Sequence, residues 1–173
     1  MDQEHLIAHI HDAPERLVFA FAGAGSLALW QLHRVAGSSR TILEARDCYA
    51  VSALSNWLGF TPTQAVSIET AVAMAQQAYR HAQTLAATGP LLGIACTAAV
   101  ATDRERRGAE RAVVAIADCD ALCTYDLMMT KGIRNRNEEE HLIAELLIAA
   151  IARACGIDVA LPTVREDEMI RQQ

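Results

Sequence analysis

The sequence predicts a single three-layer α/β/α domain built around a mixed, mostly parallel sheet. Apolar runs of strand length alternate with longer segments in which apolar residues recur at helical spacing. A length of 173 residues suits one domain. The composition is 52% hydrophobic, which provides for a sizeable core and argues against disorder.

The first half of the chain is expected to alternate helix and strand. Pro14 ends an amphipathic helix, because proline cannot continue one. Two glycines later in the chain form the turn between a buried strand and a second helix. The expected elements are the helix 2–12, the strand 17–22, the helix 26–35, the strand 41–47 and the helix 49–58.

In the second half, Thr61, Pro62 and Gln64 predict a helix start, and Ser67 predicts the cap of a longer helix that Gly89 ends. Asn137 with Glu140 predicts the capping pair of the last helix, which Gly156 ends. Further elements expected here are a central strand at 91–97 and a hairpin of strands 111–117 and 122–129. Residues 1–156 thus form the domain, and residues 157–173 a polar C-terminal tail on the surface.

Composition narrows the function classes. A net charge of −6 gives no indication of nucleic-acid binding, and no apolar run is long enough to span a membrane, so neither partner is expected. The acidic start is not a secretory signal, and five cysteines without regular spacing suit reduced thiols in the cytoplasm. Cys119 and Cys123 have no matching second pair, so no metal, and no other cofactor, is expected.

The segment FAFAGAGSLALW, residues 19–30, passes from strand to helix through two glycines. Residues 23–28 fit the Gly-x-Gly-x-x-Ala form of the dinucleotide fingerprint, and Glu44 follows at about the distance of a ribose-binding acid. The antiparallel middle strands and the short chain weigh against a complete dinucleotide-binding fold. The glycines also serve a tight turn without any ligand.

Three segments together resemble the C-terminal domain of the CinA competence/damage-inducible family: VFAFAGAGSLALWQLHRVAGSSRTILEARDCYA, SIETAVAMAQQAY and GIACTAAVATDRERRGAERAVVAIA. The most specific features are the Gly-Ser-Ser at 37–39, Tyr49 ten residues past Ser39, and the helix that begins at Ser67. The resemblance covers roughly residues 3–155. It implies an α/β/α domain, often a homo-oligomer, that hydrolyses the carboxamide of nicotinamide mononucleotide without a metal.

The catalytic residues of that family carry over only in part. Its first loop reads Glu-Ser-Cys-Thr-Gly-Gly, with the serine as nucleophile; counting back from Gly37, the serine falls on Ala22 and the glutamate on Phe21. The family's tyrosine is kept as Tyr49, but the lysine that helps activate the serine falls on Leu54. The resemblance therefore implies a branch without the catalytic serine and lysine.

Ligands of α/β sheets bind at the carboxyl ends of strands, so a small phosphorylated ligand such as a pyridine nucleotide is expected there. The candidate binding residues are Gly23, Ala24, Gly25, Ser26, Tyr49, Thr97, Thr102, Asp103, Arg104 and Arg107. The arginine-rich runs 102–108 and 131–136 either supply guanidinium groups for phosphate or are solvated turns.

Two alternatives stay open. The first is an amide hydrolase with a relocated nucleophile, for which the candidate catalytic residues are Tyr49, Ser26, Cys96 and Thr97. The second is a structural or regulatory oligomer whose cleft has collapsed around Phe21.

Overall fold

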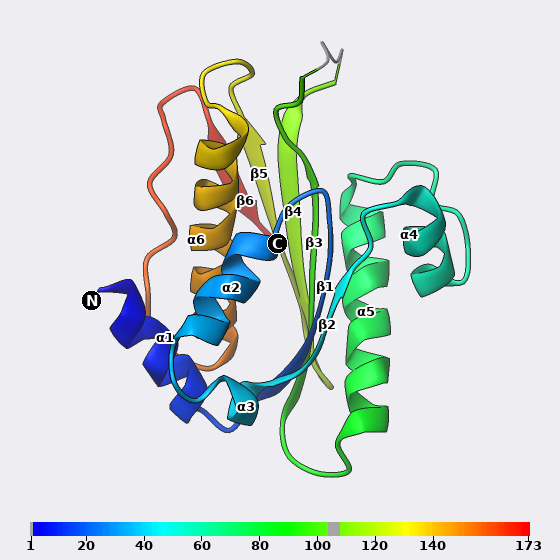
Figure 1. Ribbon diagram of the computed structural model, residues 1–173, viewed down its shortest axis with the longest axis vertical. Coiled ribbons are helices and arrows are strands. Elements are labelled where there is room, and N and C mark those ends of the chain that lie inside the picture. Colours follow the sequence, from blue (N-terminus) through cyan, green and yellow to red (C-terminus); the bar gives the residue numbers. More distant parts are fainter. Residues whose placement is uncertain (1, 104–107) are drawn as a thin grey trace.

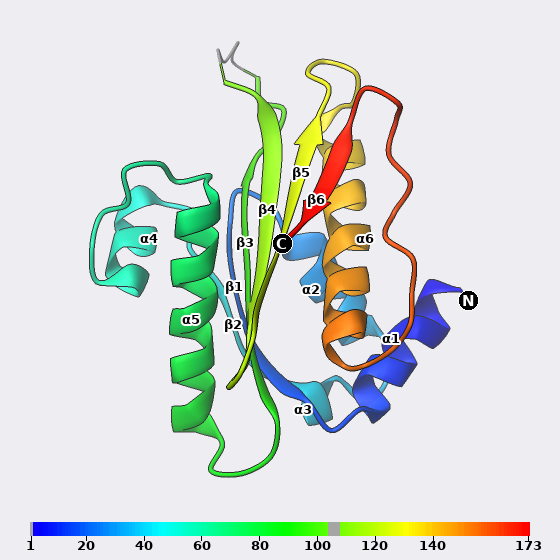
Figure 2. The ribbon, with the colours of Figure 1, turned by 180° about the vertical axis from the view of Figure 1, so that it is seen from behind.

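In a computed structural model, which describes residues 2–103 and 108–173, helices cover both faces of one six-stranded sheet (Figure 1). The strands are β1 (Arg16–Ala22), β2 (Ile42–Asp47), β3 (Leu91–Ala99), β4 (Glu110–Ala117), β5 (Leu122–Met129) and β6 (Met169–Gln172). The helices are α1 (Gln3–Asp12), α2 (Ser26–Arg34), α3 (Ser38–Thr41), α4 (Val51–Leu58), α5 (Ile68–Leu85) and α6 (Arg136–Ala154). Helices α1, α2 and α6 lie on one face, and α4 and α5 on the other (Figures 1 and 2).

The strand order is β2-β1-β3-β4-β5-β6. Strand β1 pairs in parallel with β2 and with β3, whereas the pairs β3–β4, β4–β5 and β5–β6 are antiparallel. The predicted three-layer fold with a mixed sheet is confirmed, but the sheet is not mostly parallel, because three of the five strand pairs described are antiparallel. Parallel pairing is confined to the half formed by β2, β1 and β3, and that half places the site.

Each face of the sheet has its own apolar core. On one face the buried residues of α5 are mostly alanines, and Gly93 of β3 lets the helix approach closely, since a Cβ there would lie 2.1 Å from the carbonyl oxygen of Ala75. On the other face α6 buries larger side chains, among them Leu146 and Leu147, against Phe19. Burial of each such leucine contributes about 1.5–3 kcal/mol, so this face holds α6 firmly.

The helix predicted to start at Thr61 does not form, and residues 61–67 are irregular. Their polar groups are used by other bonds: the Thr70 hydroxyl donates to the Gln64 carbonyl at 2.6 Å, and the Thr97 hydroxyl donates to the Ala65 carbonyl at 2.5 Å. The second expected start is confirmed, because the Ser67 side chain accepts from the Thr70 amide and α5 begins directly after it.

Helix α6 begins earlier than its predicted cap, Asn137 with Glu140. The observed capping box joins Asn135 and Glu138, each side chain accepting from the other residue's amide. The predicted pair was wrong by two positions. As a result, Glu139 and Glu140 are free to bind outside the helix.

The tail expected on the surface adds a strand to the sheet. After α6 the chain runs back along that helix and ends in β6, beside β5 (Figure 2). Glu168 just before β6 is buried, pairs with Arg134 and accepts from the Thr130 amide at 3.0 Å. The division at residue 156 stays a prediction. Among the described residues no helix combines the length and apolar character needed to cross a membrane.

Candidate functional site

The carboxyl ends of β1, β2 and β3 meet at one edge of the sheet. Phe21 of β1 is in register with Asp47 of β2 on one side and with Cys96 of β3 on the other, and Ala22 is in register with Thr97. Because parallel strands end together, the glycine loop after β1 lies beside the connections that follow β2 and β3. The segments in which ligand-binding residues were expected therefore lie at one edge.

The glycine loop is pressed against the end of β3, which explains its first glycine. Gly23 has a φ of +90°, and a Cβ at this position would lie 2.1 Å from the carbonyl oxygen of Ala98. Any side chain would therefore require both a strained backbone and a displaced strand. Gly25, with a φ of +125°, then precedes the first residue of α2.

A cavity of about 390 Å³ lies between this loop, the end of β2 and the start of α6. Three residues of the loop line it, Gly23, Ala24 and Ser26, and the Ser26 hydroxyl is the polar side-chain group among them. The other lining residues are two aromatic residues, one amide and three charged residues, namely Phe21, Tyr49, Asn137, Asp47, Glu140 and Arg136. The described lining thus carries two carboxylates and one guanidinium.

Glu140 of α6 occupies the amides of the glycine loop. Its Oε1 accepts hydrogen bonds from the backbone N–H of Gly25 at 2.9 Å and of Leu27 at 3.0 Å. The Ser26 hydroxyl donates to the same oxygen at 3.2 Å. A carboxylate from the protein itself therefore holds the donors that the sequence assigns to a ligand phosphate.

Arg136 ties two loops together from the first turn of α6. Its guanidinium donates to the carbonyl of Gly23 at 3.2 Å and to that of Ala101 at 3.3 Å. Among the described cations of the run 131–136, Arg136 is the one that lines the cavity, whereas Arg134 pairs with Glu168 and Lys131 donates to the Gly108 carbonyl at 3.5 Å.

The positions that the resemblance assigns to the nucleophile and the lysine are apolar and buried. Ala22 is 8% exposed and Leu54 2% exposed, and both belong to the apolar cluster on the α5 face, with Cys48 and Trp57. Neither side chain can donate or accept a proton. Tyr49, the retained member of the set, is 67% exposed and lines the cavity.

The other candidate nucleophiles differ in availability. Cys96 is fully buried, and burial raises the pKa of its thiol far above the usual range, so the thiolate is disfavoured. The Thr97 hydroxyl is buried and donates to the Ala65 carbonyl. Ser26 is exposed and is the one of these candidates whose hydroxyl lies beside a carboxylate.

The structure brings part of the predicted ligand set together. Gly23, Ala24, Ser26 and Tyr49 line the cavity, and Gly25 contributes its amide to the Glu140 contact. The described residues Thr97, Thr102 and Asp103 are not part of its lining. Arg104 and Arg107 lie outside the described residues.

Sequence reasoning missed Asp47, Arg136, Asn137 and Glu140 as cavity residues. It assigned Glu140 to the capping pair of the last helix, and it took 131–136 only as a cationic run. The available signal was three consecutive glutamates, of which a capping box needs one.

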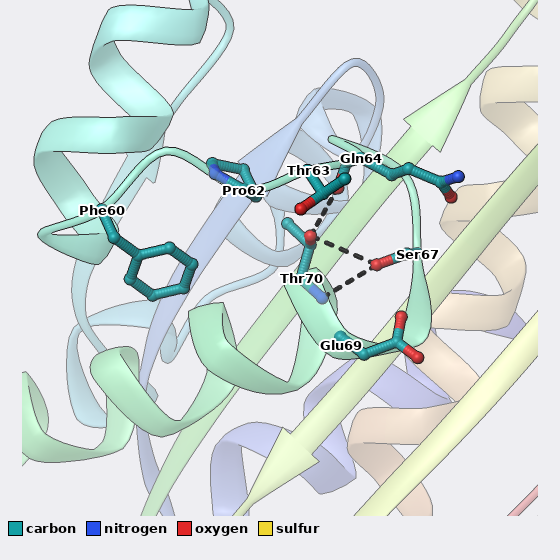
Figure 3. A pocket seen from close by; sticks show the side chains of 7 residues that line it. All are labelled: Phe60, Pro62, Thr63, Gln64, Ser67, Glu69 and Thr70. Carbon is teal, nitrogen blue, oxygen red and sulfur yellow. Dashed lines mark hydrogen bonds between the residues drawn. The ribbon is translucent and has the colours of Figure 1, made fainter.

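A second cavity, of about 480 Å³, opens at the start of α5 on the opposite face of the sheet (Figure 3). Phe60 and Pro62 form its apolar wall, and Glu69 lies on the other side. The hydroxyls of Ser67 and Thr70 are joined by a hydrogen bond of 3.2 Å. Two hydroxyls of its polar wall are thus engaged in internal bonds.

Together these features define an α/β domain of three layers with a cleft at the carboxyl edge of its parallel strands. Solved structures with the same fold belong to the CinA superfamily. The superfamily protein from Enterobacter cloacae matches with a TM-score of 0.72 at 17% identity, over 88% of this chain and 90% of that one. The Escherichia coli protein matches with a TM-score of 0.70 at 16% identity, over 90% and 91%.

The competence/damage inducible protein CihA from Agrobacterium tumefaciens matches with a TM-score of 0.65 at 20% identity, over 90% of this chain and 93% of that one. No protein-family model and no curated protein matches the sequence. The chain therefore has the CinA-like fold that the resemblance implied, and that expectation is confirmed at the level of the fold.

Proposed function

We propose that this protein is a CinA-like domain that binds a small phosphorylated ligand, such as a pyridine nucleotide, without cleaving an amide bond. The observation that carries this proposal is the pairing of an open cavity with a buried, apolar Ala22 and Leu54 at the nucleophile and lysine positions. Binding and hydrolysis need different groups, and the described residues retain those for binding.

The cavity suits a small ligand with a flat ring. Its volume of about 390 Å³ lies within the range of small-molecule sites, roughly 300–1,000 Å³. Phe21 and Tyr49 offer aromatic faces, and Asn137 offers an amide for hydroxyl groups. Arg136 supplies the positive charge that suits a phosphate.

Amide hydrolysis would require an activated nucleophile and free donors for the developing oxyanion. Ala22 and Leu54 supply neither a nucleophile nor a base. The loop amides of Gly25 and Leu27, which are the natural oxyanion donors, already bind Glu140. At the expected positions, the nucleophile is therefore absent and the oxyanion donors are occupied.

A relocated nucleophile is the second candidate function, and the contact between Ser26 and Glu140 favours it. The hydroxyl and the carboxylate are 3.2 Å apart, which is the geometry of a hydroxyl nucleophile beside a general base. Steady ammonia release from a pyridine mononucleotide, abolished by Ser26→Ala, would establish this function instead of the first.

The test is calorimetry with nicotinamide and nicotinate mononucleotides, with ammonia release measured in parallel. We expect binding without turnover. Tyr49→Ala should weaken binding about tenfold, because it removes an aromatic wall of the cavity. Phe60→Ala is the matched control: it removes another exposed aromatic ring, which lines the cavity on the α5 face and not the one beside the glycine loop. Absence of binding at millimolar nucleotide, or equal weakening by both variants, would contradict the proposal.

A further inference from the structure

We infer that Glu140 is a built-in competitor for the anion-binding donors of the glycine loop, so that a ligand phosphate binds there only after the Glu140 carboxylate has left. This inference rests on the proposed function, since it concerns the same cavity. It adds an autoinhibitory contact between α6 and the loop that precedes α2.

The contact has the form of a bound anion. One carboxylate oxygen receives three donors, the amides of Gly25 and Leu27 and the Ser26 hydroxyl, at 2.9, 3.0 and 3.2 Å. Hydrogen bonds to an ionised acceptor are the stronger kind, and the start of α2 adds the positive end of its dipole. The donors are thus already directed at a negative charge.

A phosphate cannot share these donors with Glu140. Each N–H makes one strong hydrogen bond, and two anions at contact distance repel each other. Glu140 also lines the cavity from which a ligand would approach. The ligand therefore has to replace the carboxylate. The free energy needed to break the Glu140 contact weakens the net affinity for the ligand.

The architecture allows Glu140 to leave without undoing the loop or the helix. The capping box of Asn135 and Glu138 completes the start of α6, so the helix does not need Glu140 for its own amides. Arg136 holds the Gly23 carbonyl independently. Glu140 is half-buried at the cavity wall, so its side chain can turn outward into solvent.

Calorimetric titration of the full chain with inorganic phosphate and with nicotinamide mononucleotide tests the inference. Glu140→Gln keeps the shape of the side chain and removes its charge, so both anions should bind about ten- to hundredfold more tightly than to the unmodified protein. Glu145→Gln is the matched control, because Glu145 is an exposed glutamate of the same helix outside this cavity. It should leave both affinities unchanged.

A pyridine nucleoside, which has no phosphate, tests whether the effect depends on the anion. The affinity for the nucleoside should change much less in Glu140→Gln than the affinity for the nucleotide. Glu140→Ala serves as a second variant if the glutamine variant does not fold. Nucleotide binding with equal affinity in all variants would overturn the role of Glu140 and leave the proposed function standing. If neither the unmodified protein nor a folded Glu140 variant binds the nucleotide, the proposed function fails as well.

Discussion

The pH dependence of stability should depend on Glu139, the glutamate next to Glu140. Its side chain is fully buried, and Oε2 accepts from the Ala101 amide at 2.6 Å, whereas Oε1 has no hydrogen-bond partner among the described residues. Burial is the main cause that raises the pKa of Glu139 to about 7, and the nearby Glu110 carboxylate adds to it. The Ala101 bond and the Arg134 guanidinium act in the opposite direction.

The sign and size of the effect follow from this shift. The pKa of Glu139 is higher in the folded protein than its ordinary value of 4.5, so its contribution is fully present below pH 4.5 and is lost as the pH rises through about 7. At 1.36 kcal/mol per pH unit the complete shift corresponds to at most about 3 kcal/mol. Relaxation of the surrounding protein weakens such electrostatic effects even at buried sites, which reduces the expected loss to about 1–2 kcal/mol.

Glu139→Gln removes the titration while keeping an acceptor for the Ala101 amide, and its NH₂ group supplies a donor towards Glu110. We therefore expect the free energy of unfolding of the variant, relative to that of the unmodified protein, to increase by about 1–2 kcal/mol from pH 5 to pH 8. Urea unfolding followed by circular dichroism at both pH values gives this difference, and Glu145→Gln controls for the loss of a surface charge. A Glu139→Gln difference that is the same at pH 5 and pH 8 would refute the reasoning.

Three further predictions concern single residues. Gly23→Ala should cost more than about 2 kcal/mol in urea unfolding, because its Cβ meets a carbonyl of β3, whereas Gly59→Ala, also at positive φ but with no atom within 4 Å, should cost about 1 kcal/mol. In thiol labelling the exposed Cys119 should react in the folded protein and the buried Cys96 only on unfolding; rapid native labelling of Cys96 would contradict this. Arginine pairing lowers the pKa of Glu168 to about 2, so Glu168→Gln should cost about 1–2 kcal/mol at pH 7, and the difference should shrink as the pH falls from about 4.5 towards 2.

Elements with a periodic apolar pattern could be predicted from the sequence almost to the residue. The strand 122–129 has the predicted bounds, and α5 begins directly after the predicted cap Ser67. In both cases the signals are local: side-chain alternation for a strand, and a hydroxyl that accepts from an amide three residues on for a helix start.

Local sequence signals do not determine where α6 begins. Asn135 with Glu138 and Asn137 with Glu140 have the same capping spacing, so the sequence alone cannot choose between them. The choice is made by contacts across the fold, since Glu139 accepts from the Ala101 amide just after β3 and Glu140 binds the glycine loop. The edge strand β6 was missed for a similar reason: its four residues are too few to form an apolar pattern, and its pairing depends on the edge of β5.

The candidate site was predictable to the same extent. The rule that parallel strands end together correctly placed Gly23, Ser26 and Tyr49 at one edge. The rule cannot identify Arg136 or Glu140, because both come from a helix more than a hundred residues further along the chain, and only the packing of α6 brings them to the loop.

Two features of the site act on different steps and must be separated. Ala22 and Leu54 bear on bond cleavage: buried in an apolar cluster, they supply no group for proton transfer at the two positions that the resemblance assigns to the serine and the lysine. Glu140 bears on occupancy: its carboxylate accepts from the loop amides that a phosphate would need, so on our inference its effect reverses when the side chain turns away. Under these two proposals, substitutions in the sequence prevent hydrolysis, whereas the position of one carboxylate controls binding at the glycine loop.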